Sequence, residues 1–136
     1  MIKQKEIVLE GFKRGYHLIT RLIEEKLGDL PSEGLLHILV KHTSAGITIN
    51  ENADPSVRTD FHSFIDELIP ENHPLYQHTL EGSDDMPAHL KSSLIGASIT
   101  IPITNHRLNL GTWQGIYFCE FRNRGGARKL VLTLYY

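Results

Sequence analysis

The spacing of apolar residues in the first third of the chain predicts a strand, a helix and a second strand. Residues 5–10 form a short apolar-rich run typical of a strand. Residues 12–27 carry apolar side chains at helical spacing, and Gly28 is a natural stop. Residues 35–40 are apolar on both faces, which is the pattern of a strand in the middle of a sheet.

Two further helices are predicted from their start signals. Asp54 can accept backbone hydrogen bonds as an N-cap, Pro55 suits the first helical position, and the helix ends before Pro70. Its apolar side chains fall on one face: Val57, Phe61, Phe64, Ile65 and Leu68. A shorter helix is predicted over residues 86–95, with Asp85 as its N-cap.

The remaining segments alternate with the period of strands. Residues 47–50 alternate directly after the buried strand, which predicts a hairpin around residues 43–46. This turn is either an anion-binding nest of backbone N–H groups or simply a tight turn. Later strands are predicted over residues 98–104, 107–110, 116–121 and 130–135, with a two-residue turn at Asn105–His106. Strands that crowd the C-terminal half predict an α+β fold with mostly antiparallel strands.

Composition narrows the classes of function. The 136 residues suit a single domain, 1–136, and the net charge of −2 without a basic block argues against a nucleic-acid partner. The one cysteine, Cys119, excludes an internal disulfide, and its strand position predicts a buried thiol. No signal peptide and no apolar run of bilayer length are found, so we expect no membrane partner and a cytoplasmic location.

The stretch over residues 78–93 holds the densest candidate chemistry. A loop with two histidines at its flanks and three carboxylates leads into the helix over residues 86–95. Histidine and carboxylate clusters attract divalent metals, and helix N-termini attract anions. The alternative is a polar loop that only caps the helix.

Four ordered blocks of sequence resemble one known family. They are residues 42–46 (His-Thr-Ser-Ala-Gly), 49–55 (Ile-Asn-Glu-Asn-Ala-Asp-Pro), 84–93 (Asp-Asp-Met-Pro-Ala-His-Leu-Lys-Ser-Ser) and 110–116 (Leu-Gly-Thr-Trp-Gln-Gly-Ile). Together they resemble the YjbQ family, also called the secondary thiamine-phosphate synthase family, over nearly the whole chain. The family usually has Asn-Gly where this chain has Asn105–His106, so we exclude His106 from the site.

The resemblance implies a YjbQ-like two-sheet β-sandwich with two main helices, assembled as a homotrimer. It also implies weak metal-assisted synthesis of thiamine phosphate from a pyrimidine pyrophosphate and a thiazole phosphate, with release of pyrophosphate. The alternatives are a metal-dependent enzyme acting on another small phosphorylated substrate, and a non-catalytic trimer that binds a metal or a small anion.

Each part of this chemistry has candidate residues. His42, His78 and His89 are the predicted metal ligands, with Glu81 or Asp85 beside them. The metal is either zinc, which imidazoles favour, or magnesium, which pyrophosphate chemistry favours.

Other residues are assigned to catalysis and to the substrate. The predicted catalytic residues are Asp85, His89 and Lys91. The predicted substrate- and anion-binding residues are Thr43, Ser44, Asn50, Asn52, Trp113, Gln114 and Arg124. Lys91, Arg124 and the Thr43–Ser44 turn would hold phosphate. Trp113 and Gln114 would hold a heterocyclic ring.

Overall fold

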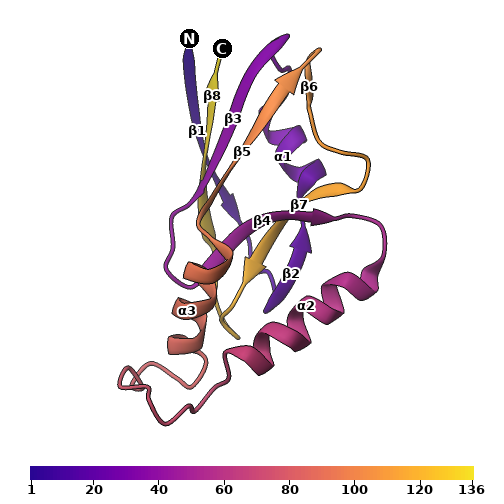
Figure 1. The fold of residues 1–136 in the computed structure, drawn as a ribbon. Helices are drawn as coiled ribbons and strands as arrows, with labels where there is room; N and C mark the ends of the chain where they lie inside the picture. Colours follow the sequence, from indigo (N-terminus) through magenta and orange to yellow (C-terminus); the bar gives the residue numbers. More distant parts are fainter.

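The computed structural model describes all 136 residues as three helices and eight strands (Figure 1). The strands are β1 (Ile2–Leu9), β2 (Gly15–Leu18), β3 (Glu33–Val40), β4 (Ala45–Glu51), β5 (Ser98–Thr104), β6 (Arg107–Leu108), β7 (Gln114–Glu120) and β8 (Arg128–Tyr135). The helices are α1 (Thr20–Leu27), α2 (Pro55–Leu68) and α3 (Asp85–Ile95). None of the three has the length and apolarity needed to cross a bilayer.

The strands form two antiparallel sheets. The five-stranded sheet has the order β1-β8-β3-β5-β6, and the three-stranded sheet has the order β2-β7-β4. Strands β1 and β8 pair along their whole length, so the chain termini lie side by side (Figure 1). The α+β class and the two-sheet architecture are therefore as predicted, with a short third helix, α1, in addition to the two main helices.

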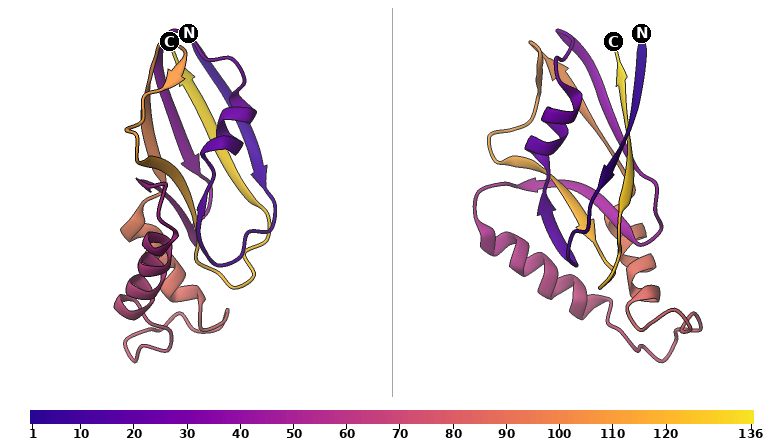
Figure 2. Two further views of the ribbon diagram at one scale, coloured as in Figure 1. Left: turned by 90° about the vertical axis from the view of Figure 1, so that its right-hand side faces the viewer. Right: turned by 180° about the vertical axis from the view of Figure 1, so that it is seen from behind.

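The three-stranded sheet separates two hydrophobic cores. The larger core lies between the two sheets and includes the buried Ile19 and Ile23 from the α1 region. The smaller core lies on the other face of the three-stranded sheet, where α2 and α3 cover it with Ile65 and Ala88. Figure 2 shows α2 and α3 together at the end of the molecule opposite the chain termini. The prediction that Cys119 is buried is confirmed, and burial raises the pKa of its thiol.

The start of α2 agrees with its sequence signals, and the start of α3 differs by one residue. Asp54 caps α2 by accepting a 2.9 Å hydrogen bond from the backbone N–H of Ser56, and Pro55 is the first helical residue. In α3 the N-cap is Asp84, and Asp85 is already inside the first turn. The prediction that Asp85 is the N-cap is thus wrong, because its carboxylate has cationic and imidazole partners instead.

The predicted helix over residues 12–27 is wrong in its first half. Residues 15–18 form β2 on the edge of β7, and only Thr20–Leu27 is helical. Gly15 has a φ of +139°, which is far from helical. The free edge of β7 supplies the backbone partners that a longer helix would otherwise provide.

The predicted hairpin around residues 43–46 is also wrong. Strand β3 pairs on one side with β5 and on the other with β8, so it has no free edge for β4. The chain instead crosses at residues 41–44 from the five-stranded sheet to the three-stranded sheet, where β4 pairs with β7. This crossing segment lies beside α3 and takes part in the candidate site.

The turn at Asn105–His106 is confirmed. Both residues have positive φ values, 50° and 62°, as a two-residue turn with a left-handed backbone requires. The ring Nδ1 of His106 is 2.9 Å from the carbonyl oxygen of Leu30, which holds the side chain against the loop after α1. The strand after this turn is shorter than predicted and comprises only Arg107 and Leu108.

Candidate metal centre

Three side chains from the loop before α3 and from its first two turns meet at one point. The Nε2 atoms of His78 and His89 lie 2.7 Å and 3.1 Å from the same oxygen, Oδ2 of Asp85. Asp85 and His89 are four residues apart on α3, which places them on the same face of the helix. Their potential ligand atoms all lie within 4.8 Å of one another. We call His78, Asp85 and His89 the triad.

The hydrogen bonds of His89 indicate that either a proton or a metal ion lies between its ring and Asp85. Its Nδ1 is 2.8 Å from the carbonyl oxygen of Thr43, which can only accept, so Nδ1 carries a proton. In a neutral ring, Nε2 then presents a lone pair to the oxygen of Asp85. Two lone pairs at 3.1 Å need a shared cation, either a proton or a metal ion. A metal-binding histidine commonly has this arrangement, with its second nitrogen donating to a carbonyl.

The two carboxylate oxygens of Asp85 have different kinds of partner. Its Oδ1 accepts a hydrogen bond of 2.5 Å from Arg122, and its Oδ2 faces the two imidazoles. Burial by itself raises the pKa of this carboxyl, but the hydrogen bond from His78 and the charges of His89 and Arg122 outweigh burial and lower the pKa. The Asp85 side chain is therefore a carboxylate at neutral pH, and Arg122 orients it.

Arg122 also joins the triad to the loop before α3. Its Nε donates to Asp84 over 2.9 Å, and its Nη2 donates to the backbone carbonyl of Glu81. Asp84 accepts a further hydrogen bond from the backbone N–H of Asn123. The Glu81 carboxylate lies 4.0 Å from Nε2 of His78 and is exposed, so it stands at the margin of the triad.

The donor set fits a divalent metal ion. Two imidazole nitrogens and one carboxylate oxygen are the ligands that zinc uses in sites that keep a further position open. Two donor atoms that bind one zinc ion tetrahedrally lie about 3.4 Å apart, so the imidazoles, at 2.7 Å and 3.1 Å from Oδ2 of Asp85, would have to move slightly outward to admit the ion. The triad is thus a candidate metal centre made by one chain.

Two hollows flank the triad. One, of about 320 Å³, lies on the His78 side and includes His73, Tyr76 and Ser83 in its wall. The other, of about 430 Å³, lies on the His89 side and includes His42, Thr43 and Ser93. A ligand of the metal could approach from either side.

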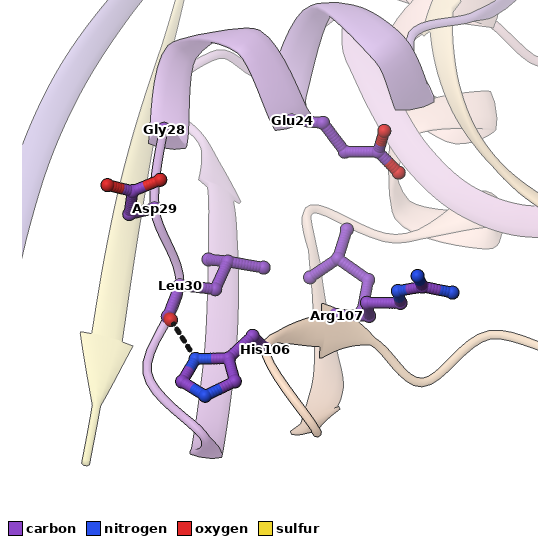
Figure 3. A pocket seen from close by; sticks show the side chains of 7 residues that line it. Glu24, Gly28, Asp29, Leu30, His106 and Arg107 are labelled. Atoms are coloured by element: carbon purple, nitrogen blue, oxygen red, sulfur yellow. Dashed lines mark hydrogen bonds between the residues drawn. The ribbon is translucent and has the colours of Figure 1, made fainter.

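A larger hollow than these two lies elsewhere. It has a volume of about 760 Å³ and is lined by residues around the end of α1 and the turn between β5 and β6 (Figure 3). His106 and Arg107 belong to its wall, and α3 lies at the opposite end of β5 (Figure 1). This hollow is therefore separate from the triad.

The structure places His42 beside the triad but outside it. Its Nε2 accepts a 2.7 Å hydrogen bond from the backbone N–H of Lys129, so that lone pair is already used. Burial and the charge of Arg128 lower its pKa, which agrees with a neutral, accepting ring. Thr43 is exposed in the same hollow, whereas Ser44 is buried and its Oγ accepts from Arg128.

Lys91 points away from the triad. It is 1% exposed and forms an ion pair with Asp66 of α2. Asp66 also accepts a 2.9 Å hydrogen bond from Arg14. The ammonium group therefore joins α2 to α3, and the structure does not bring it together with Asp85 and His89.

The predicted ring-binding residues lie at the far end of the three-stranded sheet. The β4–β7 register pairs Ala45 with Glu120 near the triad and Glu51 with Gln114 at the other end. Six strand steps of about 3.3 Å separate these pairs by roughly 20 Å. Asn50, Asn52, Trp113 and Gln114 are at this far end, all exposed, and Trp113 is 64% exposed. Arg124 is exposed on the turn between β7 and β8.

The sequence analysis missed three residues around the triad. Arg122, Glu120 and Arg128 are all absent from the predicted site. Their common signal is a charged residue at the end of a strand that is otherwise apolar, as in Cys119-Glu120-Phe121-Arg122. A charge inside such a run is buried only with a partner, but the run does not indicate which partner.

The fold and the site define a small α+β protein of two antiparallel sheets, with a histidine–carboxylate centre at the start of α3. A family model described as UPF0047 protein YjbQ-like matches residues 5–136. The UPF0047 protein YjbQ of Salmonella typhimurium is 50% identical over 133 residues, which is 96% of each chain. The chain belongs to the YjbQ (UPF0047) family.

Solved structures of similar proteins have the same fold. A YbjQ-like protein of unknown function from Sulfolobus solfataricus matches with a TM-score of 0.83 and 25% identity, covering 98% of this chain and 96% of that one. A conserved hypothetical protein from Thermus thermophilus matches with a TM-score of 0.80 and 34% identity, covering 95% and 97%. The two-sheet architecture is thus common to these proteins.

Proposed function

We propose that the protein is a divalent-metal-dependent enzyme acting on a small phosphorylated substrate. The observation that carries the proposal is the triad, in which His89 and Asp85 direct a nitrogen and an oxygen lone pair at the same point. The two flanking hollows leave room for a ligand next to a bound ion.

The reaction to test first is the synthesis of thiamine phosphate. In this reaction the carbon–oxygen bond to pyrophosphate breaks as the thiazole nitrogen bonds to the same carbon, and pyrophosphate leaves with the electron pair. A divalent ion supplies charge neutralisation for the leaving group. The chain would hold the ion with His78, Asp85 and His89, and would orient the carboxylate with Arg122.

We expect purified protein to form thiamine phosphate slowly from the two substrates, and a chelator to abolish the activity. The rate is expected to be low because the structure holds no nucleophile or phosphate-binding lysine at the triad, so proximity and charge neutralisation contribute most of the effect. The measurement is chromatographic detection of thiamine phosphate, with and without chelator and with added zinc or magnesium. Product no greater than in a protein-free control would remove this reaction from consideration.

A non-catalytic trimer that binds a metal or an anion is the second candidate. The ion pair of Lys91 with Asp66 supports its metal-binding form, because this lysine is then not available to hold the phosphate of a substrate. Metal binding without turnover of any phosphorylated substrate would select this candidate.

We also propose that the chain assembles as a homotrimer. No helix lies over the outer face of the five-stranded sheet (Figure 2), where the strand register aligns Ile2, Tyr135 and Leu35 in one apolar row. Their exposures are 62%, 45% and 43%. Exposed apolar rows of this kind are commonly covered by another subunit. Assembly also offers a source for ring-binding residues, because the Trp113 cluster of the same chain is too far from the triad.

Sedimentation equilibrium at micromolar protein is expected to give three times the mass of the chain. Leu35→Lys, which introduces a charge into the apolar row, is expected to shift the population towards monomer, while Ser63→Lys on the exposed surface of α2, away from this sheet, serves as the control. A stable monomer of the unaltered chain would rule out the trimer. The cytoplasmic location and the absence of a nucleic-acid partner remain predictions from the sequence.

A further inference from the structure

A second polar cluster lies next to the triad, and the proposed function assigns it no role. Its centre is the ion pair between Glu120 at the end of β7 and Arg128 at the start of β8. Glu120 is 0% exposed, and its two carboxylate oxygens accept hydrogen bonds of 2.7 Å and 2.5 Å from Arg128. The backbone leaves room for this carboxylate, since a Cβ at Gly125 would lie 2.0 Å from it.

Arg128 of this ion pair is hydrogen-bonded to residues 41–44, the crossing segment that includes Thr43. Nη2 of Arg128 donates to both the carbonyl and the hydroxyl of Ser44, over 3.3 Å and 3.0 Å. The next residue, Lys129, donates its backbone N–H to His42 and accepts from the backbone N–H of Lys41. Residues 41–44 are thus attached to the start of β8 at several points.

This attachment sets the direction of the Thr43 carbonyl, which accepts the Nδ1 proton of His89. Glu120, the other partner of the ion pair, contacts Arg122. Its Oε2 accepts a 3.2 Å hydrogen bond from the backbone N–H of Arg122. Arg122 in turn orients the carboxylate of Asp85. His89 and Asp85 are therefore both held in place by residues that are connected to the buried carboxylate of Glu120.

We propose that Glu120 and Arg128 are positioning residues of the metal centre. They hold the Thr43 carbonyl, which keeps a proton on Nδ1 of His89 and directs its Nε2 towards Asp85, and they hold the Arg122 guanidinium, which aims the Asp85 carboxylate at the same point. This inference rests on the proposed metal site. Its energetic basis is that partners of metal ligands commonly change metal affinity by about 10- to 100-fold when they are removed.

The test compares Arg128→Lys and Glu120→Gln with the unaltered protein. Arg128→Lys keeps the positive charge but loses the planar fork that reaches Glu120 and Ser44 together. Zinc affinity is measured by competition with a chromophoric chelator, and the protonated nitrogen of His89 is identified by nitrogen-15 NMR of the metal-free protein at pH 8. Both variants are expected to bind zinc about 10- to 100-fold more weakly. In both, part of the His89 population is expected to move its proton from Nδ1 to Nε2.

A matched control separates positioning from stability. Asp66→Asn weakens the ion pair that joins α2 to α3, yet Asp66 contacts neither Thr43 nor Arg122. It is expected to lower stability while leaving zinc affinity and the His89 tautomer unchanged. Ser44→Ala removes only the hydroxyl contact with Arg128 and is the mildest variant, with a smaller change expected in the same direction.

The possible outcomes separate the inference from the proposed function. Weaker zinc binding together with the tautomer change in folded variants supports the positioning role. A folded Arg128→Lys or Ser44→Ala variant that keeps the wild-type tautomer and affinity overturns it. If the unaltered protein binds neither zinc nor magnesium, the proposed function fails, while the tautomer comparison in metal-free protein still decides whether Arg128 and Glu120 position His89.

Discussion

Replacing His89 by alanine is expected to weaken divalent-metal binding by at least about 100-fold, because one of only three protein ligands is removed. The fold should survive the change. The ring is partly exposed, and its hydrogen bonds go to the Thr43 carbonyl and to Asp85 rather than into a hydrophobic core. Isothermal titration with zinc, and circular dichroism of the same samples, measure the two properties separately. The thiamine-phosphate activity, if present, should fall with the metal affinity.

His73→Ala is the matched control for this experiment. His73 lies in the wall of the hollow beside His78, but it is outside the triad, and its Nδ1 accepts the backbone N–H of Leu75. Its removal is expected to change metal affinity less than about threefold, as for a residue that does not touch the ion. Unfolding or subunit dissociation of His89→Ala would instead identify His89 as a structural residue. Equal losses in the two variants would show that the ion binds elsewhere.

Replacing Asp66 by alanine is expected to lower the free energy of unfolding by about 2–3 kcal/mol, the largest stability change that we predict. The substitution leaves the ammonium group of Lys91 buried without its partner, and breaking a fully buried pair commonly costs about 3–5 kcal/mol. The value is set lower here because the Asp66 side chain is 34% exposed. Urea unfolding followed by circular dichroism measures the change.

Lys91→Met should be much less destabilising, because Asp66 keeps Arg14 at 2.9 Å and partial exposure to water. The double variant Asp66→Ala/Lys91→Met should recover most of the loss, since it leaves no unpaired buried charge. A double variant as unstable as Asp66→Ala alone would contradict the assignment of the loss to Lys91. Retained metal binding and activity in Lys91→Met would separate this structural role from the catalytic role predicted for Lys91.

The same ion pair gives an expected pH dependence. Burial raises the pKa of Asp66, but the hydrogen bonds and charges of Lys91 and Arg14 outweigh burial, so the pKa is lowered on folding. A lowered folded pKa stabilises the native state above the unfolded pKa, which is about 3.9 for aspartate. That contribution disappears as the pH falls through the folded pKa. The stability difference between the unaltered protein and Asp66→Asn should therefore shrink as the pH is lowered below about 4.

Local signals in the sequence predicted those elements whose determinants lie within a few residues. Asp54 and Pro55 define the start of α2 because a cap and a fixed φ act on adjacent backbone groups. Asn105 and His106 define a turn for the same reason. The helix predicted from residue 12 failed where a distant strand, β7, offered hydrogen bonds to residues 15–18.

The candidate site likewise combines features set by neighbouring residues with features set by distant parts of the chain. The sequence placed His78, Asp85 and His89 within one stretch of twelve residues, and Asp85 and His89 four residues apart on one helix. It predicted His42 as the third ligand, however, with Glu81 or Asp85 beside the histidines. It also suggested that residues 42–44 contribute, through the resemblance to the YjbQ family.

Only the tertiary structure decided which other groups meet there. Lys91 is on the same helix as His89, yet packing against α2 directs it to Asp66. Arg122 is 37 residues from Asp85, and Arg128 is 84 residues from Ser44, and both are brought into contact by the pairing of β7 with β4 and by the placement of α3. Charges select their partners by distance in space, and in this protein that distance is set by the sheets rather than by spacing along the chain.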